Sequence, residues 1–187
     1  IGIMSGTSLD GVDLAYCSFQ KEKGWKYSIL HAETIPYPTG LLESLKNSMQ
    51  LPAADLLKLD HELGKYLGKL CRRFIAENRL EPDFIASHGH TVFHRPDLSF
   101  SLQIGHGYDI AAATELPVIY DFRGADIARG GQGAPLVVAG DQHLFSDYDA
   151  CLNLGGFSNI TVLKEGEPQA WDICPVNTVL NELSRRL

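Results

Sequence analysis

The chain opens with the stretch IGIMSGTSLDGVD, residues 1–13, and this stretch decides the fold that we expect. Residues 1–4 form a short apolar run, and the pair Asp10-Gly11 is a strong signal for a turn between two antiparallel strands. Strand-like apolar runs follow over 12–19 and over 25–35, with a polar turn at 21–24 between them. The sequence therefore predicts three consecutive antiparallel strands within residues 1–35, with Thr7–Gly11 as the first turn.

Helices and strands alternate along the rest of the chain. Residues 53–78 form the clearest predicted helix, because its apolar residues recur at spacings of three and four and so share one face: Leu56, Leu59, Leu63, Leu67, Leu70 and Phe74. Further helices are predicted over 41–49, 109–115, 135–145 and 177–187, and further strands over 84–87, 100–104, 117–120, 150–154 and 159–163. This order predicts an α/β fold, with a mixed sheet, an opening antiparallel β-meander and flanking helices.

Composition excludes several classes of protein. The formal net charge is −7, so no nucleic-acid-binding surface is expected. No apolar run approaches the ~18 residues that a membrane-spanning helix needs, and no signal peptide is visible. The four cysteines form no CxxC pair, which excludes a zinc ribbon, and we expect free thiols in a reducing cytoplasm: Cys17, Cys71, Cys151 and Cys174.

Two Gly-rich turns, far apart in the sequence, are candidate phosphate-binding sites. Glycine lets backbone N–H groups approach an anion closely, and Ser and Thr add hydroxyl donors. The structural alternative is an ordinary Asp-Gly hairpin in the first turn and a tight glycine turn in the second. Asp10 or Asp13 could hold a magnesium ion through water. The candidate phosphate-binding residues are Gly6, Thr7, Ser8, Leu9, Asp10, Gly11, Val12 and Asp13 in the first turn and Gly155 and Gly156 in the second.

A histidine-rich stretch, residues 86–94, carries a third candidate site. His88, His90 and His94 could bind a metal such as zinc, although no HExxH helix accompanies them. The interpretation that we favour places them in a loop, where they donate hydrogen bonds to a sugar or a phosphate.

Two further polar segments leave alternatives open. Residues 121–135 are dense in glycine and charge, and they predict either a mobile solvated loop or one wall of a ligand site with Arg123 and Gln132 as polar contacts. Asp172 follows a strand-like stretch and precedes Pro175. It could cap the helix that begins there, or it could act as a general base facing a cleft.

Together these segments resemble the anhydro-N-acetylmuramic acid kinase family. The similar residues are, in order, 4–11 (MSGTSLDG), 87–89 (SHG), 103–105 (QIG), 121–123 (DFR), 130–135 (GGQGAP) and 153–159 (NLGGFSN). The resemblance implies an actin-like sugar-kinase fold. Because the family's proteins are longer, residues 1–187 would form the N-terminal actin-like domain, and about 170–187 would begin the connection to a second domain that this chain lacks.

The resemblance also implies an activity. Such a kinase uses ATP, Mg²⁺ and water to open 1,6-anhydro-N-acetylmuramic acid and to phosphorylate it to N-acetylmuramic acid 6-phosphate, in cytoplasmic peptidoglycan recycling. Asp172 matches the family's catalytic aspartate, and residues 6–13 match its ATP-phosphate loop. The partners would be ATP and the sugar, with no nucleic acid or membrane, and a homodimer is compatible with the sequence. The residues expected to bind the sugar are His88, Thr91, Arg123, Asp126, Gln132 and Asn177.

One segment departs from the family's pattern. The family usually has Asp-x-Gly-Pro-Gly-Asn, whereas residues 172–177 here are DICPVN, so Cys174 and Val176 replace glycines. Their side chains could crowd the approach of the sugar or of a phosphate. A second interpretation is therefore a degenerate relative that binds a sugar or a nucleotide without turnover.

Overall fold

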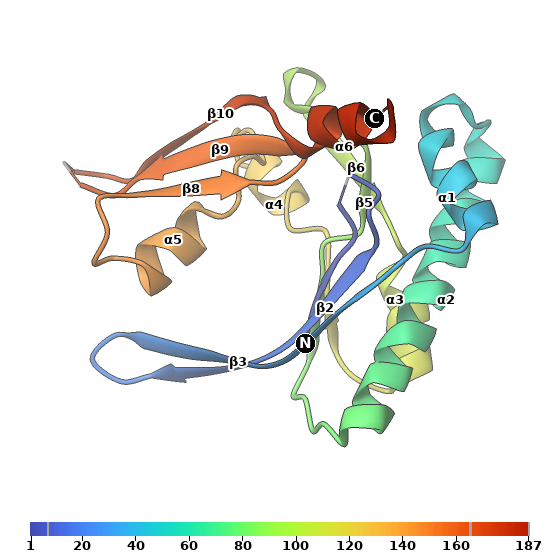
Figure 1. The fold of residues 1–187 in the computed structure, drawn as a ribbon, viewed down its shortest axis with the longest axis horizontal. Helices are drawn as coiled ribbons and strands as arrows, with labels where there is room; N and C mark the ends of the chain where they lie inside the picture. The colour runs from blue at the N-terminus through green and yellow to red at the C-terminus, as the bar shows by residue number, and fades with distance from the viewer. Residues whose placement is uncertain (7, 165, 187) are drawn as a thin grey trace.

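The computed structural model describes residues 1–6, 8–164 and 166–186, and the first strands of the chain build its largest sheet (Figure 1). The strands β1 (Gly2–Met4), β2 (Val12–Lys21) and β3 (Trp25–Ile35) pair antiparallel in sequence order. The strand β4 (Ile85–Ser87) lies parallel to β1, and β7 (Val118–Ile119) lies parallel to β4. The order β3-β2-β1-β4-β7 confirms the predicted mixed sheet and its opening meander.

Helices α2 (Ala53–Asn78) and α3 (Gly107–Thr114) pack against each other and against this sheet (Figure 1). The predicted apolar face of α2 is buried, except for Leu56 at its margin, which is partly buried. This face meets the inward side chains of β2 and β4, including Val12, Leu14 and Ile85, in one hydrophobic core. The core of the molecule therefore lies between α2 and the first sheet.

A short helix, α1 (Thr39–Lys46), and a 3₁₀ helix, η1 (Ser48–Gln50), precede α2. We expected one helix over 41–49, but the chain leaves helical geometry at Asn47. The side-chain Nδ2 of Asn47 donates a hydrogen bond of 2.8 Å to the carbonyl of Glu43. Asn side chains compete in this way with the backbone for helical hydrogen bonds, which explains the break.

A separate antiparallel sheet of three strands follows later in the chain, in the order β10-β9-β8 (Figure 1). It consists of β8 (Ala150–Leu154), β9 (Phe157–Val162) and β10 (Gln169–Pro175), and α6 (Asn177–Arg186) follows β10 directly. The helices α4 (Gly124–Ile127) and α5 (Val138–Leu144) connect the two sheets along the chain. Both lie on the side of the second sheet that faces the first meander (Figure 1).

A two-stranded hairpin overturns the loop predicted around residues 86–94. The strand β5 (His90–Arg95) pairs with β6 (Phe100–Ile104), and a 3₁₀ turn, η2 (Pro96–Leu98), joins them. His90 and Val92 are buried, while the residues between and after them are more exposed. This alternation is typical of a strand, and the polar residue His90 at a buried position hid it in the sequence.

Smaller differences concern element ends. The helix α5 begins at Val138 rather than at Pro135, and β10 runs over seven residues where we expected only a short strand-like stretch before Asp172. The four-residue helix α4 lies inside a segment that we expected to be loop. Among the described residues, no helix combines the length and the apolar character needed to cross a bilayer.

Candidate functional site

The first Gly-rich turn connects β1 to β2 through residues 5–11, and Tyr37 anchors its start. Ser5 is fully buried, and its Oγ shares a hydrogen bond of 2.5 Å with the Tyr37 hydroxyl. Gly11 has no room for a side chain, because a Cβ there would lie 2.7 Å from the carbonyl oxygen of Ile35. The side chain of Val12 is fully buried, so only its backbone could face a ligand. Thr7 lies outside the described residues.

The second Gly-rich turn connects β8 to β9 and caps α6. The backbone N–H of Val176 donates to the carbonyl of Gly156 at 2.9 Å, and the N–H of Asn177 donates to the carbonyl of Gly155 at 3.1 Å. The Thr178 hydroxyl also donates to the Gly156 carbonyl, at 3.0 Å. Because the C=O and N–H of a trans peptide point in opposite directions, the N–H groups that follow these carbonyls point away from α6.

Helix α6 borders both turns. The side-chain Nδ2 of Asn181, one turn into α6, donates a hydrogen bond of 3.0 Å to Asp10 Oδ1 in the first turn. The same helix begins on the carbonyls of Gly155 and Gly156 in the second turn. The structure therefore brings both turns to one helix.

The two aspartates of the first turn differ in how they fit a magnesium ion. Asp10 is exposed within the turn, and the described contact of its carboxylate uses one oxygen, which accepts from Asn181. Asp13 lies on β2 opposite Met4, and its Oδ1 accepts a hydrogen bond of 2.6 Å from Thr34. Carboxylate oxygens are the ligands that Mg²⁺ prefers, and of the two aspartates Asp10 lies within the turn itself, whereas Asp13 lies on the following strand.

Asp172 belongs to a row of polar side chains across the second sheet. It lies directly opposite Asn159 of β9, and Asn159 lies opposite Asn153 of β8. Residues opposite each other in antiparallel strands share a face of the sheet. Thr161, two residues after Asn159, shares that face, and its hydroxyl donates a 2.6 Å hydrogen bond to Asp141 of α5. The row therefore faces inward, toward α5 and the first meander (Figure 1).

Arg123, at the start of α4, brings a positive charge to this inner face. Its Nη1 donates to the carbonyl of Gly133 at 2.5 Å, and its Nη2 lies 2.9 Å from His88 Nε2. Burial lowers the pKa of Arg123, while the negative charge of Asp172 acts in the opposite direction. The pKa of His94 is lowered, mainly by burial and then by the positive charge of Arg123, and the negative charge of Asp172 opposes this shift. Arg123, His94 and Asp172 are therefore within electrostatic reach of one another.

The other two histidines of the stretch are held as neutral rings. Burial lowers the pKa of His88, and it lowers the pKa of His90 to about 4 although a hydrogen bond with the Gly6 backbone opposes the shift. The metal site that we considered on His88, His90 and His94 is not supported. Among the described residues, the one group whose ligand atoms gather closely enough to hold a metal lies elsewhere and is formed by His61, His106 and Asp109.

The segment 121–135 is held together by its own polar groups. Asp121 Oδ1 accepts a hydrogen bond of 3.1 Å from the N–H of Gly124, and Asp126 Oδ2 accepts one of 2.7 Å from the N–H of Gly133. With the contact between Arg123 and Gly133, these bonds give the segment an internal hydrogen-bond network. The carboxylate of Asp126 is partly engaged within the wall, and Gln132 is exposed on it.

Two of the other expected sugar-binding residues also have partners. Thr91 Oγ1, on β5, accepts a hydrogen bond of 3.4 Å from Gln103 of β6. Asn177, at the start of α6, donates through Nδ2 to the carbonyl of Leu154 at 3.2 Å. Thr91 thus belongs to the same hairpin as His94, and Asn177 lies beside the second Gly-rich turn.

The departure at Cys174 does not reach the face that carries Asp172. A β-bulge between Asp172 and Cys174 shifts the register, so that Cys174 lies opposite Ser158, whereas Asp172 lies opposite Asn159. Asn159 and Ser158 are adjacent in β9 and so point to opposite faces, and their partners Asp172 and Cys174 therefore do so too. The Cys174 Sγ lies 3.4 Å from Ser158 Oγ, which agrees with this placement.

Asn159 is a candidate site residue that our reasoning from the sequence missed. Its side-chain Oδ1 is buried and has no hydrogen-bond partner among the described residues. A buried polar atom without a partner is costly, and at the centre of a polar row it indicates a ligand-binding position. The alternation of the strand, with Asn159 two residues before the buried Thr161, was the available signal.

Comparison with known proteins identifies the family. The model of the anhydro-N-acetylmuramic acid kinase family matches residues 1–186. Relatives named anhydro-N-acetylmuramic acid kinase include those of Pasteurella multocida, 40% identical over 97% of this chain and 50% of the relative, and of Shewanella oneidensis, 42% identical over 97% of this chain and 52% of the relative. The relative in Francisella tularensis subsp. novicida is 36% identical over 97% and 52%. The chain thus spans about half the length of these relatives. It belongs to the anhydro-N-acetylmuramic acid kinase family.

Proposed function

We propose that the full-length protein is an ATP-dependent kinase that opens 1,6-anhydro-N-acetylmuramic acid and produces N-acetylmuramic acid 6-phosphate and ADP. The relatives that cover this chain are named for that kinase. The observation that carries the proposal is the inward row of Asp172, Asn159 and Asn153, with Arg123 and His94 within electrostatic reach of Asp172. A carboxylate among hydrogen-bonding groups is what hydrolytic ring opening requires.

In the proposed reaction, Asp172 is the general base. It accepts a proton from water as the water oxygen forms a bond to the anomeric carbon of the sugar. The bond between that carbon and the bridging oxygen 6 breaks, and oxygen 6 takes the γ-phosphoryl group of ATP, which leaves ADP. The pairing of β10 with β9 holds Asp172 on the inner face, and the positive charge of Arg123 favours its ionised form. Asn159, with its unpartnered Oδ1, is placed to accept a hydrogen bond from the water or from a sugar hydroxyl.

We propose that the two Gly-rich turns bind the phosphates of ATP. Backbone N–H groups of residues 6–13 would surround the phosphates from one side, and those that follow Gly155 and Gly156 would do so from the other. Asp10 would hold Mg²⁺ through water. Mg²⁺ supplies charge that offsets the negative oxygens of the triphosphate. Because the proposed reaction uses ATP and a recycled amino sugar, we propose that the protein acts in the cytoplasm.

The sugar-binding residues are proposed to be His88, Thr91, Arg123, Asp126, Gln132 and Asn177, with Asn159 added. His88 contacts Arg123 directly, and Thr91 shares the β5–β6 hairpin with His94. The exposed Gln132 offers both a donor and an acceptor. Asp126 has a second carboxylate oxygen besides Oδ2, which accepts the hydrogen bond from Gly133. These groups offer donors and acceptors of the kind that sugar hydroxyls need.

An actin-like architecture accounts for the two sheets. Each begins as an antiparallel meander of three consecutive strands, β1–β2–β3 and β8–β9–β10, and a helix follows each meander. We propose that the residues before β8 form the N-terminal actin-like domain and that the second meander opens the other domain. On this view the second domain begins near β8 rather than near residue 170, and the remaining half of the full-length protein completes it.

The test is phosphorylation of 1,6-anhydro-N-acetylmuramic acid by the full-length protein, with levoglucosan as a competing substrate. The variant Asp172→Asn should cut turnover by ~10²–10⁴-fold, because that is what general-base catalysis typically contributes. Affinity for ATP should stay nearly unchanged. The variant Asp55→Asn, which changes an exposed aspartate in the first turn of α2, is the matched control and should keep turnover within a few-fold.

Three outcomes would revise the proposal. Turnover of Asp172→Asn within a few-fold of the unmodified enzyme would remove Asp172 from catalysis. Loss of ATP affinity with turnover intact would move Asp172 to the nucleotide site. A full-length protein that binds the sugar or ATP but releases no ADP would establish the degenerate relative, which the placement of Cys174 away from Asp172 disfavours.

A further inference from the structure

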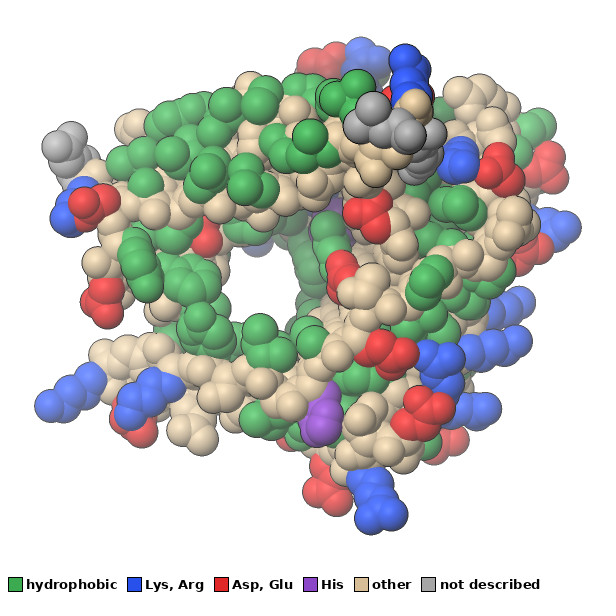
Figure 2. All heavy atoms as spheres, viewed as in Figure 1, with side chains coloured by type: hydrophobic (Ala, Val, Ile, Leu, Met, Phe, Trp, Pro, Cys, Tyr) green, Lys and Arg blue, Asp and Glu red, His purple; other side chains and the backbone are tan. Residues whose placement is uncertain are grey.

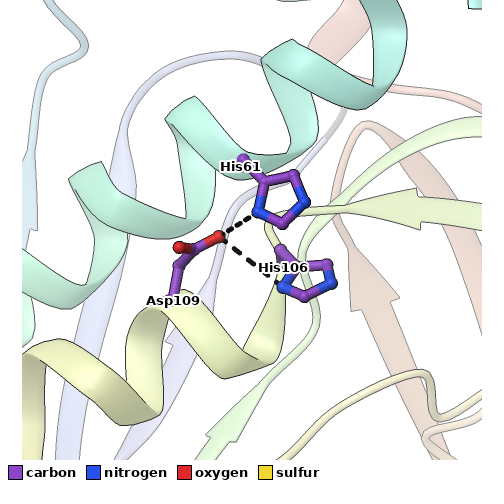
Figure 3. A group of neighbouring side chains, drawn as sticks. All are labelled: His61, His106 and Asp109. Atoms are coloured by element: carbon purple, nitrogen blue, oxygen red, sulfur yellow. Dashed lines mark hydrogen bonds and ion pairs between the residues drawn. The ribbon is translucent and has the colours of Figure 1, made fainter. Parts of the chain in front are cut away.

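Two histidines and one aspartate meet outside the candidate site, where α2 packs against the start of α3 (Figure 3). His61 belongs to α2, His106 immediately precedes α3, and Asp109 lies in the first turn of α3. His61 Nδ1 lies 2.5 Å from Asp109 Oδ2, and His106 Nδ1 lies 3.5 Å from the same oxygen. One ligand atom from each residue lies within 4.8 Å of the others.

The three side chains converge on one point. Figure 3 shows the two imidazole rings side by side, with both Nδ1 atoms directed at the Asp109 carboxylate. The ring centroids are 4.2 Å apart. His106 Nδ1 is buried and makes no hydrogen bond with any described residue, and its one described polar contact is the 3.5 Å approach to Asp109 Oδ2. His61 is about half exposed, so the group remains open to solvent on one side.

The backbone around the cluster is held in place from α2. The N–H of Gly105 donates to Asp60 Oδ1 at 2.7 Å, and the N–H of His106 donates to the Asp60 carbonyl at 3.2 Å. Gly64, one turn after His61, permits this approach, because a Cβ there would lie 2.6 Å from the carbonyl oxygen of His106. The positions of His61, His106 and Asp109 are thus set by close packing of the two helices rather than by the side chains themselves.

We propose that His61, His106 and Asp109 bind a divalent transition-metal ion, with Zn²⁺ as the ion that their chemistry fits best. Imidazole nitrogens favour Zn²⁺, Cu²⁺ and Ni²⁺, and a carboxylate completes common three-residue zinc sites in which water takes the fourth position. Bond lengths of ~2.0–2.2 Å in a tetrahedral site place ligand atoms about 3.3 Å apart. The contact between His106 and Asp109 is close to that spacing, and the contact between His61 and Asp109 must open by less than about 1 Å. The ligand atoms of His61 and His106 lie within 4.8 Å of each other and must close by at most about 1.5 Å.

The metal would clamp α2 to the start of α3. This role is independent of the proposed kinase reaction, because the cluster shares no residue with the Gly-rich turns, with Asp172 or with the sugar-binding residues. It would act on stability by binding the folded state in preference to the unfolded one.

The test uses the full-length protein, freed of metal with a chelator and titrated with Zn²⁺ by isothermal titration calorimetry. We expect one high-affinity ion per chain and a rise in the melting temperature when the site is filled. His61→Ala and Asp109→Asn should each lower the affinity by more than about tenfold, since changes outside the ligand shell already cost ~10–100-fold. His143→Ala, which removes another histidine in the last turn of α5, should leave the affinity unchanged.

Substitution with Co²⁺ gives a second measurement, because a four-coordinate Co²⁺ ion with histidine ligands absorbs visible light strongly. This absorption should appear in the unmodified protein and in His143→Ala, and it should be lost in Asp109→Asn even if that variant folds normally. Binding that is absent in the unmodified protein, or that is equal in the three variants, would overturn the proposal and leave the cluster as an ion pair between the helices.

Discussion

The two β-meanders of the molecule share a topology but differ in what covers them. In the first, the inward residues Val12 and Leu14 of β2 are 0% and 1% exposed, because α2 packs over them. In the second, Leu152 of β8 and Trp171 of β10 are 58% and 48% exposed. These two flank Ile160 of β9 and lie on the face opposite the polar row. Figure 2 shows hydrophobic side chains spread over this part of the surface.

The difference shows that strand pattern and burial are separate properties. Both meanders alternate apolar residues with polar ones, and this alternation is enough to specify strands. Burial depends on whether another element lies against the apolar face. Exposed apolar faces are typical of interfaces. We propose that this face is covered by the half of the relatives' length that the present chain does not span.

The largest effect that tests this comparison is expected in the core beneath the first meander. Leu67 of α2 is fully buried, and Leu67→Ala should lower the free energy of unfolding by ~2–5 kcal/mol, because it removes buried methyl groups and leaves a cavity. Urea denaturation of the full-length protein measures this. Leu57→Ala on the same helix, where Leu57 is 63% exposed, is the control and should cost less than about 0.5 kcal/mol. Equal costs at the two positions would contradict the assigned core.

A second change of similar size in the free energy of unfolding should appear on acidification. It tests the burial of His90, which forms a hydrogen bond with the Gly6 backbone of the first turn. Burial lowers the pKa of His90 to about 4, and the charge of the neighbouring His88 adds to this, whereas the bond to Gly6 opposes it. Between pH ~6.5 and about 4 the unfolded chain therefore binds a proton at this position that the folded chain does not. The free energy of unfolding should fall by about 3 kcal/mol as the pH drops through this window.

Unfolding midpoints in urea at pH 7 and pH 4.5 provide the measurement. His90→Gln should flatten the pH dependence, because the group that takes up the proton on unfolding is gone. His31→Gln, at an exposed position of β3, should retain the slope of the unmodified protein. Parallel slopes for His90→Gln and the unmodified protein would show that other groups control the acid response.

The smallest of the three effects is expected at the second meander, and it tests the proposed second domain. In the full-length protein Leu152→Ala should lower the free energy of unfolding by ~1–3 kcal/mol, because the added chain would bury a side chain that is exposed here. The same denaturation experiment applies. A change within about 0.5 kcal/mol would mean that the outer face stays in solvent, and the proposal that the second domain covers it would be wrong.

Most helices and strands could be predicted from the sequence. The helix over 53–78 was predicted with its observed ends, because its apolar spacing and its flanking residues are local signals. The opening meander and most later elements were predicted within a few residues for the same reason. The hairpin over 90–104 was only half predicted, because the polar residues of β5, His90, Thr91, His94 and Arg95, obscured its period.

Which residues meet across the chain was decided only by the tertiary structure. The pairing of Asp172 with Asn159, the bulge that turns Cys174 to the other face, and the contact of Asn181 with Asp10 depend on strand register and helix packing. No local pattern encodes these, because a register shift of one residue reverses every face. The approach of His61 to His106 and Asp109 likewise required two helices to pack closely at Gly64. The sequence by itself determined the elements and the family resemblance, and packing determined which chemical groups share a site.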